Sequence, residues 1–211
     1  MDAETVCVLT GDIVGSSALG RRRLDAVFEA LAAAGSEVMG WTGGRGPERF
    51  RGDGWQLLIE DPARALRVAL RMRAAVRAAV DRAETRIAVG FGAVRSGATL
   101  ADSAGPAFER AGRGLDGLRT HRKLVLVDAF DDGPEQALVD GLAATCDVLS
   151  QRWTARQADV FARACAPDAP TLKSIAGDLG VTPQTVQAHF SRGAGPALID
   201  AIEAFERGFG G

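Results

Sequence analysis

The chain has 211 residues, of which 46% are hydrophobic and 25% are charged, a composition typical of globular proteins. Its formal net charge of −2 excludes binding to nucleic acid through a bulk surplus of Lys and Arg. Its apolar runs are short and broken by Arg or Gly, which excludes a membrane-spanning helix.

The first residues and the cysteines indicate the cellular compartment. The sequence begins with acidic residues, unlike a signal peptide, and continues directly into an apolar strand pattern. Cys7, Cys146 and Cys165 lie far apart in apolar surroundings, which excludes a disulfide framework or a zinc site. We therefore expect a cytoplasmic protein with reduced, buried thiols.

The N-terminal part predicts a strand, a loop, a helix and a hairpin. Residues 6–10 have the pattern of a buried strand, and the small residues 11–17 form a loop that leads into an amphipathic helix over residues 21–39. A Gly-rich turn at 41–47 precedes a hairpin around Gly52-Asp53-Gly54, because Asp-Gly accepts the positive φ of a tight turn.

A second helix begins at Asp61-Pro62 and runs to about residue 80, with an apolar stripe along one side. On its other side we expect a solvated face, formed by Arg64, Arg67, Arg71, Arg73 and Arg77. The elements that follow are a strand at 86–94, a loop at 100–105, a helix at 106–118 and a strand at 124–127.

The order β-α-β-β-α-β-α-β indicates an α+β fold, in which an antiparallel hairpin interrupts crossover units. We expect a ferredoxin-like sheet of the cyclase or palm type with its helices on one face. After a break at residues 131–134 the patterns are helical. The predicted segments are a sheet domain at 1–130, a linker or dimerisation helix at 131–153 and an all-α helix-turn-helix domain at 154–211.

The C-terminal segment has the spacing of a helix-turn-helix, with Thr171 capping one helix, Gly180-Val181 forming a turn and Thr182-Pro183 beginning the next helix. The expected small core consists of Leu172, Ile175, Ala176, Leu179, Val181, Val186 and Phe190. The predicted DNA-binding residues, whose side chains suit base edges and phosphates, are Thr182, Gln184, Thr185, Gln187, His189, Ser191 and Arg192.

The run LKSIAGDLGVTPQTVQAHFSR resembles the helix-turn-helix of sigma-factor region 4 and of response-regulator output domains. The resemblance implies that the chain binds DNA, as a homodimer that reads two half-sites. The alternative is a helical hairpin that only packs or dimerises.

Two carboxylates in the N-terminal part predict a binding site. Asp12 follows the first strand, and Asp53 lies at the tip of the hairpin. In a ferredoxin-like sheet these two elements are neighbours, so both carboxylates can face one cleft beside the backbone amides of Val14, Gly15, Ser16 and Ser17. Such a group suits a divalent metal and a polyphosphate. The alternative is that Asp12 is a cap and Asp53 a turn former.

Three motifs resemble those of class III nucleotidyl cyclases. The family's "D-I-x-G-F-T" is similar to DIVGSS at 12–17, its "K-x-x-G-D" to RFRGD at 49–53, and its "D-x-x-G-x-x-V-N-x-A-x-R" to DSAGPAFERAGR at 102–113. The likeness covers roughly residues 5–128, with the elements in the same order. The GDIVGS start, joined to a C-terminal helix-turn-helix, also resembles the SatD-type family of bacterial proteins.

The cyclase resemblance implies roles for individual residues. Asp12, Ile13 and Asp53 correspond to the ligands of Mg²⁺ or Mn²⁺ that accompany a bound nucleoside triphosphate. Arg49 and Asp102 correspond to the residues that read the base, which leaves adenine and guanine both open. The remaining positions are Arg113, where an arginine stabilises the α-phosphate, and Glu109, where an asparagine orients the ribose.

Glu109 departs from the family pattern. An ionised carboxylate cannot donate a hydrogen bond to ribose, and beside a triphosphate its charge costs more than ~1 kcal/mol. No clear counterpart of the family's late phosphate-binding lysine is present, since Lys123 stands in an ambiguous position. We therefore expect a transcription regulator with a degenerate, purine nucleotide-binding sensor domain. The alternatives are an active purine nucleotide cyclase with a DNA-binding tail and a dimerisation scaffold indifferent to nucleotides.

Overall fold

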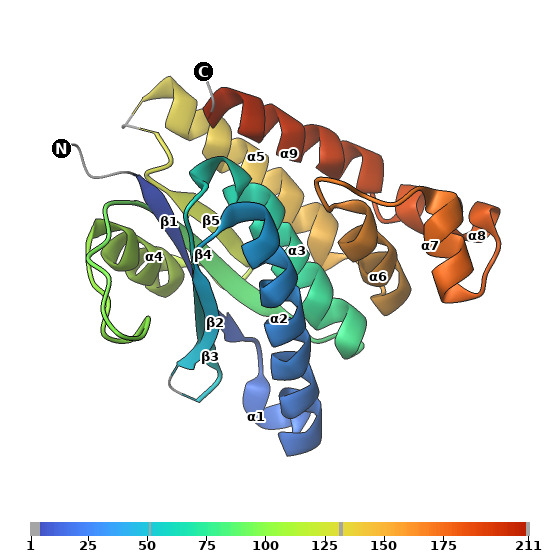
Figure 1. The fold of residues 1–211 in the computed structure, drawn as a ribbon, viewed down its shortest axis with the longest axis horizontal. Coiled ribbons are helices and arrows are strands. Elements are labelled where there is room, and N and C mark those ends of the chain that lie inside the picture. The colour runs from blue at the N-terminus through green and yellow to red at the C-terminus, as the bar shows by residue number, and fades with distance from the viewer. Residues whose placement is uncertain (1–4, 51, 131–132, 210–211) are drawn as a thin grey trace.

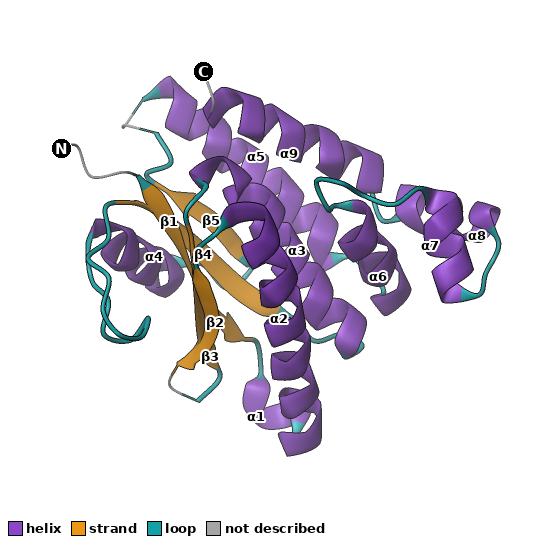
Figure 2. Cartoon of the chain, in the orientation of Figure 1, coloured by secondary structure: helices purple, strands orange, loops and turns teal. Residues whose placement is uncertain are grey.

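The structure is a computed structural model that describes residues 5–50, 52–130 and 133–209. Within these ranges one five-stranded sheet is packed between helices (Figures 1 and 2). The strands are β1 (Val6–Ile13), β2 (Arg45–Phe50), β3 (Gly54–Ile59), β4 (Thr85–Gly92) and β5 (Leu124–Val127). The helices are α1 (Ser16–Leu19), α2 (Arg21–Thr42), the 3-10 turn η1 (Pro62–Arg64), α3 (Ala65–Ala79), α4 (Pro106–Gly117), α5 (Pro134–Gln151), α6 (Ala155–Ala164), α7 (Leu172–Leu179), α8 (Pro183–Arg192) and α9 (Gly195–Phe209).

The sheet has the strand order β2-β3-β1-β4-β5. The central strand β1 pairs antiparallel with β3 on one side and with β4 on the other. The crossover through α4 then places β5 parallel to β4. The mixed α+β class is confirmed and is compatible with a ferredoxin-like fold, and the expected contact between β1 and the β2–β3 hairpin is also confirmed.

The prediction that the helices lie on one face of the sheet is wrong. Leu9 belongs to the core under α2 and α3, whereas Val8 packs on the opposite face against Ala107 and Ala111 of α4. Successive side chains of a strand point to opposite faces of the sheet, and nearly all residues of β4 are buried. Helices must therefore cover both faces of this strand. At Gly90 a Cβ atom would clash with the carbonyl oxygen of Ala107, so glycine permits the close approach of α4.

The first strand is longer than predicted. It runs through Gly11 and Asp12 to Ile13, where a loop was expected from residue 11 onward. A side chain at position 11 would clash with the Trp55 ring, which lies only 2.5 Å from where a Cβ would stand. Glycine is therefore the residue that fits this position of the strand. The Gly-rich turn is correspondingly shorter than expected, because α2 continues to Thr42.

The arginine-rich side of α3 is covered by the C-terminal helices and not solvated, which corrects the sequence-based expectation. Arg67 and Arg73 are 6% and 5% exposed. Arg67 forms an ion pair with Glu206 of α9, and Arg73 forms one with Asp147 of α5. The carboxylates in the C-terminal helices thus neutralise cations that the sequence pattern assigned to solvent.

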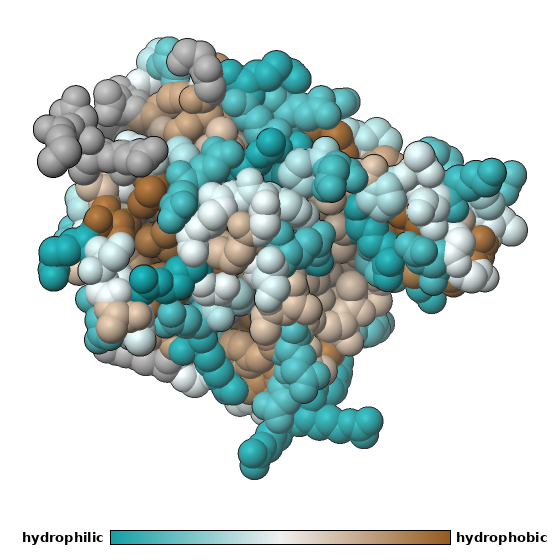
Figure 3. Space-filling model, in the orientation of Figure 1, coloured by the Kyte–Doolittle hydropathy of each residue, from teal (hydrophilic) through white to brown (hydrophobic). Residues whose placement is uncertain are grey.

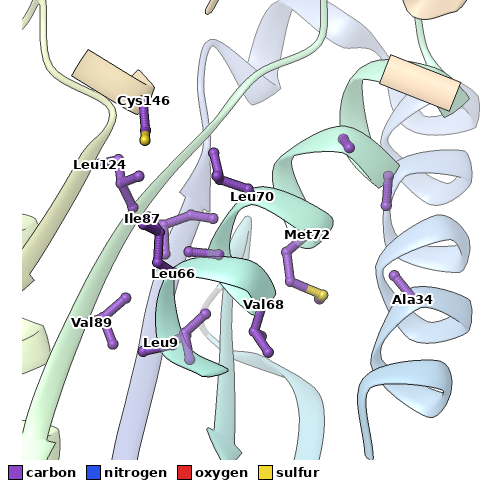
Figure 4. Packing of buried hydrophobic residues seen from close by; sticks show 14 of the residues in the cluster. Leu9, Ala34, Leu66, Val68, Leu70, Met72, Ile87, Val89, Leu124 and Cys146 are labelled. Carbon is purple, nitrogen blue, oxygen red and sulfur yellow. The ribbon is translucent and has the colours of Figure 1, made fainter. Parts of the chain in front are cut away.

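One hydrophobic core extends from the sheet into the C-terminal helices. Figure 4 shows Leu66 and Leu70 of α3 packed beside Leu9 and Ile87 of the sheet. The same cluster includes buried residues of α5, α6 and α9, namely Val139, Ala143, Cys146, Ala158, Phe161, Ala162, Leu198, Ile202 and Phe205. The three cysteines are buried and unpaired, as expected. None of the helices within the described ranges is long and apolar enough to cross a membrane.

Candidate functional site

The two predicted acidic residues lie at the same end of the sheet. Asp12 stands opposite Gly54 of β3 and opposite Arg86 of β4 in the strand register. Asp53 directly precedes Gly54, and its carbonyl oxygen accepts a hydrogen bond of 3.2 Å from the backbone amide of Ile13. The hairpin tip and the end of β1 are therefore joined, as the sequence indicated.

A buried side-chain bridge fixes this end of the sheet. The indole nitrogen of Trp55 in β3 donates to the hydroxyl of Thr85 in β4 at 3.0 Å. The Thr85 hydroxyl in turn donates to the backbone carbonyl of Asp12 at 2.7 Å. These bonds connect β3, β4 and β1 beneath the carboxylates, so the acidic residues rest on a rigid support.

Asp12 is paired with an arginine that the motif comparison did not include. The Nε of Arg86 donates to Oδ1 of Asp12 at 2.9 Å, and Nη2 donates to Oδ2. The hydrogen bonds that Arg86 donates to Asp12 are the main cause that raises the pKa of Arg86, and the charges of Asp12, Asp116 and Asp53 raise it further, against the effect of partial burial. Arg86 thus remains a cation held by Asp12.

The other carboxylate, Asp53, accepts a hydrogen bond on Oδ2 from the hydroxyl of Ser16 in α1. Gly15 precedes α1 in the left-handed region, with φ of 61°, which glycine adopts without strain. The backbone amide of Val14, predicted to lie at a phosphate site, donates to the carbonyl of Glu84 at 2.9 Å. Ser17 is exposed at the surface.

The predicted base-reading residues are not brought together within one chain. Arg49 stacks its guanidinium over the Phe28 ring of α2, 4.2 Å from the centroid, and its Nε donates to the Gly52 carbonyl. Asp102 lies in the loop before α4 and accepts a hydrogen bond of 2.7 Å from Thr99. This loop covers the opposite face of the sheet, where the Leu100 amide donates to Glu48.

The predicted ribose and phosphate residues lie on the outer surface of α4. Glu109 and Arg113 are one helical turn apart, are 69% and 66% exposed, and form a loose ion pair of 3.8 Å. The ambiguous Lys123 donates from Nζ to the carbonyl of Thr120. Within the described residues, no three His, Cys, Asp or Glu side chains are grouped in a way that could hold a metal ion.

Motif comparison missed Arg86, and a signal for it was available in the sequence. Arg86 is a charged residue at the start of an otherwise apolar strand, where a partner on the neighbouring strand is expected. Asp116 near the end of α4 also contributes its charge to Arg86 but belongs to no motif. The pairing of Arg86 with Asp12 in particular follows from the register of β1 and β4.

The second candidate site is formed by α7 and α8, which project from the body beside α6 (Figure 1). Thr171 and Thr182 cap the two helices through their hydroxyls, and Gly180 joins them in the left-handed conformation, with φ of 63°. The seven apolar residues predicted for this part all lie in one small core with Val160 of α6. The predicted local helices and turn are therefore present.

The outer face of α8 is polar. Val186 is the buried residue of this helix, and Thr182, Gln184, Gln187, Ser191 and Arg192 are exposed. Thr185 and His189 are partly buried. Hydrophilic and neutral residues cover most of the projection formed by α7 and α8 (Figure 3). Most of the side chains predicted to contact DNA are therefore accessible.

The end of α8 is tied to the start of α6. The Trp153 indole nitrogen donates to the carbonyl of Gly193, which directly follows α8, at 2.8 Å. The Trp153 ring is 3% exposed and packs against Phe161, with 4.7 Å between ring centroids. This contact fixes the direction in which α8 leaves the body of the protein.

Comparison with known proteins gives partial matches. No protein-family model matches the chain. The DNA mismatch repair protein MutS of Granulibacter bethesdensis is 33% identical over 157 residues, which cover 68% of this chain and 16% of MutS. A structure of a bacterial light-regulated adenylyl cyclase gives a TM-score of 0.43 at 17% identity, over 61% of this chain and 78% of that chain. The chain thus spans a small part of the curated relative's length.

Proposed function

We propose that the chain is a DNA-binding transcription regulator that places α8 in the major groove. The observation that carries the proposal is a capped helix, joined to α7 through the left-handed Gly180, whose outer face consists of accessible hydrogen-bonding side chains. The match to part of a DNA mismatch repair protein supports a role on DNA. The sheet and the remaining helices are the rigid body that presents this element.

The exposed residues of α8 suit direct readout of bases. Gln184 and Gln187 present amides that can form two hydrogen bonds to adenine, and Arg192 can do the same with guanine or bind phosphate. Each good pair of this kind contributes about 1–3 kcal/mol of discrimination. Because the chain has a net charge of −2, specific contacts contribute more to the affinity than counterion release.

The experiment is selection of bound duplexes from a random-sequence pool, followed by anisotropy titrations of the selected DNA. We expect Gln184→Ala and Gln187→Ala each to weaken binding by about tenfold or more, since each removes one base contact. Glu203→Ala, at an exposed position on α9, is the matched control and should bind like the unchanged protein. Absence of any enriched sequence would favour a helical hairpin that only packs.

We further propose that the regulator acts as a homodimer paired through α5. Leu138 and Val148 are the exposed large hydrophobic side chains among the described residues, at 75% and 47%, and both lie on this helix. Leu138, Thr145 and Val148 form a stripe along one side of α5. The Thr145 hydroxyl donates to the Gly141 carbonyl of the same helix and needs no outside partner. The stripe thus presents an apolar surface suited to another protein surface.

A second copy complements this stripe. Two α5 helices packed antiparallel would place Leu138 of each opposite Val148 of the other, and the acidic Glu135 end near the basic Arg152 end. Light scattering should give a dimer for the unchanged protein and a monomer for Leu138→Glu. Ala204→Glu, which adds the same charge at an exposed position of α9, should remain dimeric. A monomer in every case would refute this interface.

A second proposal is that the sheet domain senses a purine nucleotide without turning it over. The observation that favours it is the cationic Arg86, held by Asp12 at the end of the sheet where the cyclase-like motifs predict a nucleotide site. Calorimetric titration with ATP and GTP, followed by analysis for cyclic product, tests both this proposal and the alternative of an active cyclase. Binding without product supports the sensor, and cyclic product would support the enzyme.

A further inference from the structure

The cation at the Asp12–Asp53 end of the sheet is a side chain of the protein itself. Arg86 approaches Asp12 with Nε and Nη2, one donor for each carboxylate oxygen. This two-bond arrangement is the strongest form of arginine–carboxylate pairing, because the planar guanidinium matches the plane of the carboxylate. The two side chains are 34% and 22% exposed, so water screens the pair only in part.

Most of the carboxylate oxygens at this site already accept a hydrogen bond from the protein. Three of the four carboxylate oxygens of Asp12 and Asp53 accept a hydrogen bond, two from Arg86 and one from Ser16. A divalent metal needs several of these oxygens as direct ligands at about 2.0–2.6 Å. To coordinate Asp12, it would have to compete with both bonds of the Asp12–Arg86 pair and place its own charge beside the guanidinium.

The charge balance at this end of the sheet favours the guanidinium. Arg86 experiences the negative charge of Asp12, Asp53 and also Asp116 on α4. All three carboxylates therefore attract the one guanidinium, although among these three described residues Asp12 alone is seen to bond to it. Its attachment to β4 also makes the interaction intramolecular, which gives it an advantage over a metal that must be recruited from solution.

The residues present therefore do not fit a divalent cation. We infer that Arg86 is the built-in cation of the Asp12–Asp53 site and that it takes the place of the metal ion which the motif resemblance implied. The site then holds β1, β3 and β4 together without a metal, and the predicted assignment of Asp12, Ile13 and Asp53 as metal ligands is replaced by an arginine clamp. This inference is independent of whether α8 binds DNA.

The experiment is a titration with Mn²⁺ alone, in which the free ion is followed by electron paramagnetic resonance. We expect no binding to the unchanged protein at this site up to about millimolar Mn²⁺, and binding at least about tenfold tighter in Arg86→Ala, because removal of the guanidinium exposes the two carboxylates. Adding Asp12→Asn to Arg86→Ala should remove the gained site. Circular dichroism verifies the fold, and Arg86→Gln serves if Arg86→Ala does not fold.

A matched control distinguishes this site from arginine–carboxylate pairs in general. Arg110 of α4 also forms an ion pair with an aspartate, Asp128, at 2.8 Å. Arg110→Ala should therefore gain no Mn²⁺ site, because it leaves a lone carboxylate. The inference is overturned if the unchanged protein binds Mn²⁺ as tightly as Arg86→Ala, or if the folded Arg86 variants gain no binding.

Discussion

The carboxylate of Asp147 on α5 lies 2.6 Å from Nη1 of Arg73 on α3, and the two side chains are 0% and 5% exposed. Asp147 also accepts hydrogen bonds from the backbone amide of Lys123 at 2.8 Å and from the side chain of Gln151 at 2.9 Å. Burial lowers the pKa of Arg73, while the charge of Asp147 opposes this effect and keeps the guanidinium protonated. The pair thus joins α3 to α5.

Removing one partner of this pair is expected to destabilise the protein strongly. Asp147→Asn leaves the buried Arg73 guanidinium without a counter-charge, which costs about 3–5 kcal/mol in comparable buried pairs. Urea unfolding should therefore give a markedly lower midpoint. The matched control is Asp140→Asn, an exposed position on the same helix, for which the free energy of unfolding should change by no more than about 0.5 kcal/mol.

A double variant tests whether the unpaired charge of Arg73 causes the loss of stability in Asp147→Asn. Arg73→Met combined with Asp147→Asn removes both charges, while the side-chain oxygen of the new residue can still accept hydrogen bonds from Lys123 and Gln151, and removing both members of a buried ion pair is often neutral or stabilising. We expect this variant to recover most of the stability lost in Asp147→Asn. If both variants unfold at the same urea concentration, an unpaired buried charge is not the cause of the loss.

The buried arginines explain why part of the fold could not be predicted from the sequence. Arg67, Arg73 and Arg77 recur among the apolar residues of α3, and arginine side chains are usually exposed to solvent. Their burial depends on Asp147 and Glu206, which lie more than 70 residues away along the chain. A local pattern contains no information on which distant segment covers a helix, whereas the hairpin at Asp53 depends on local turn residues and was predicted correctly.

The candidate site shows the same division between local and long-range information. The convergence of Asp12 and Asp53 follows from strand adjacency and was predicted. The pairing of Asp12 with Arg86 depends on a register between strands more than 70 residues apart, and a shift of one residue would place Arg86 on the other face of the sheet. Register is fixed by packing of the whole sheet, so the clamp became apparent only in the structure.

The turn between α7 and α8 gives a second prediction. Gly180 has φ of 63°, and a Cβ at this position would meet nothing within 4 Å, so the effect of an added methyl group arises from the backbone alone. Gly180→Ala should therefore destabilise the protein by about 1 kcal/mol, because the left-handed conformation is unfavourable for alanine. The change is measured as a shift in the midpoint of urea unfolding.

A neighbouring glycine provides the control for this substitution. Gly177 lies in α7 and is exposed, and a Cβ added there would also meet nothing within 4 Å, but Gly177 has no positive φ. Gly177→Ala should be neutral or stabilise the protein by up to about 1 kcal/mol, since alanine is the better helix former. Equal destabilisation by both substitutions would contradict the assigned role of Gly180.

The buried thiols lead to a prediction on chemical reactivity. Burial raises the pKa of Cys146 to about 11 and that of Cys165 to about 12, although the nearby arginines oppose the shift. Burial also raises the pKa of Cys7, with a smaller contribution from Asp61. Since the thiolate is the reactive form, none of the three should react with a disulfide reagent in the folded protein at pH 8. All three should react in denaturant, and rapid reaction of the folded protein would contradict the burial.

The same thiols should make the protein less stable in alkali. Because the pKa values of Cys146 and Cys165 are raised above 9.0 in the folded state, the unfolded chain loses its protons first, and stability falls as the pH rises above about 9. Each thiol contributes a loss of roughly 1.4 kcal/mol per pH unit until its folded pKa is reached.

Few other groups titrate in this pH range, since the chain has no tyrosine and its lysines are Lys123 and Lys173. Urea unfolding at pH 8 and pH 10 measures the effect, and Cys146→Ala combined with Cys165→Ala should reduce the slope without abolishing it, because the pKa of Cys7 is also raised. A decline of unchanged slope in that double variant would assign the alkaline loss to other groups.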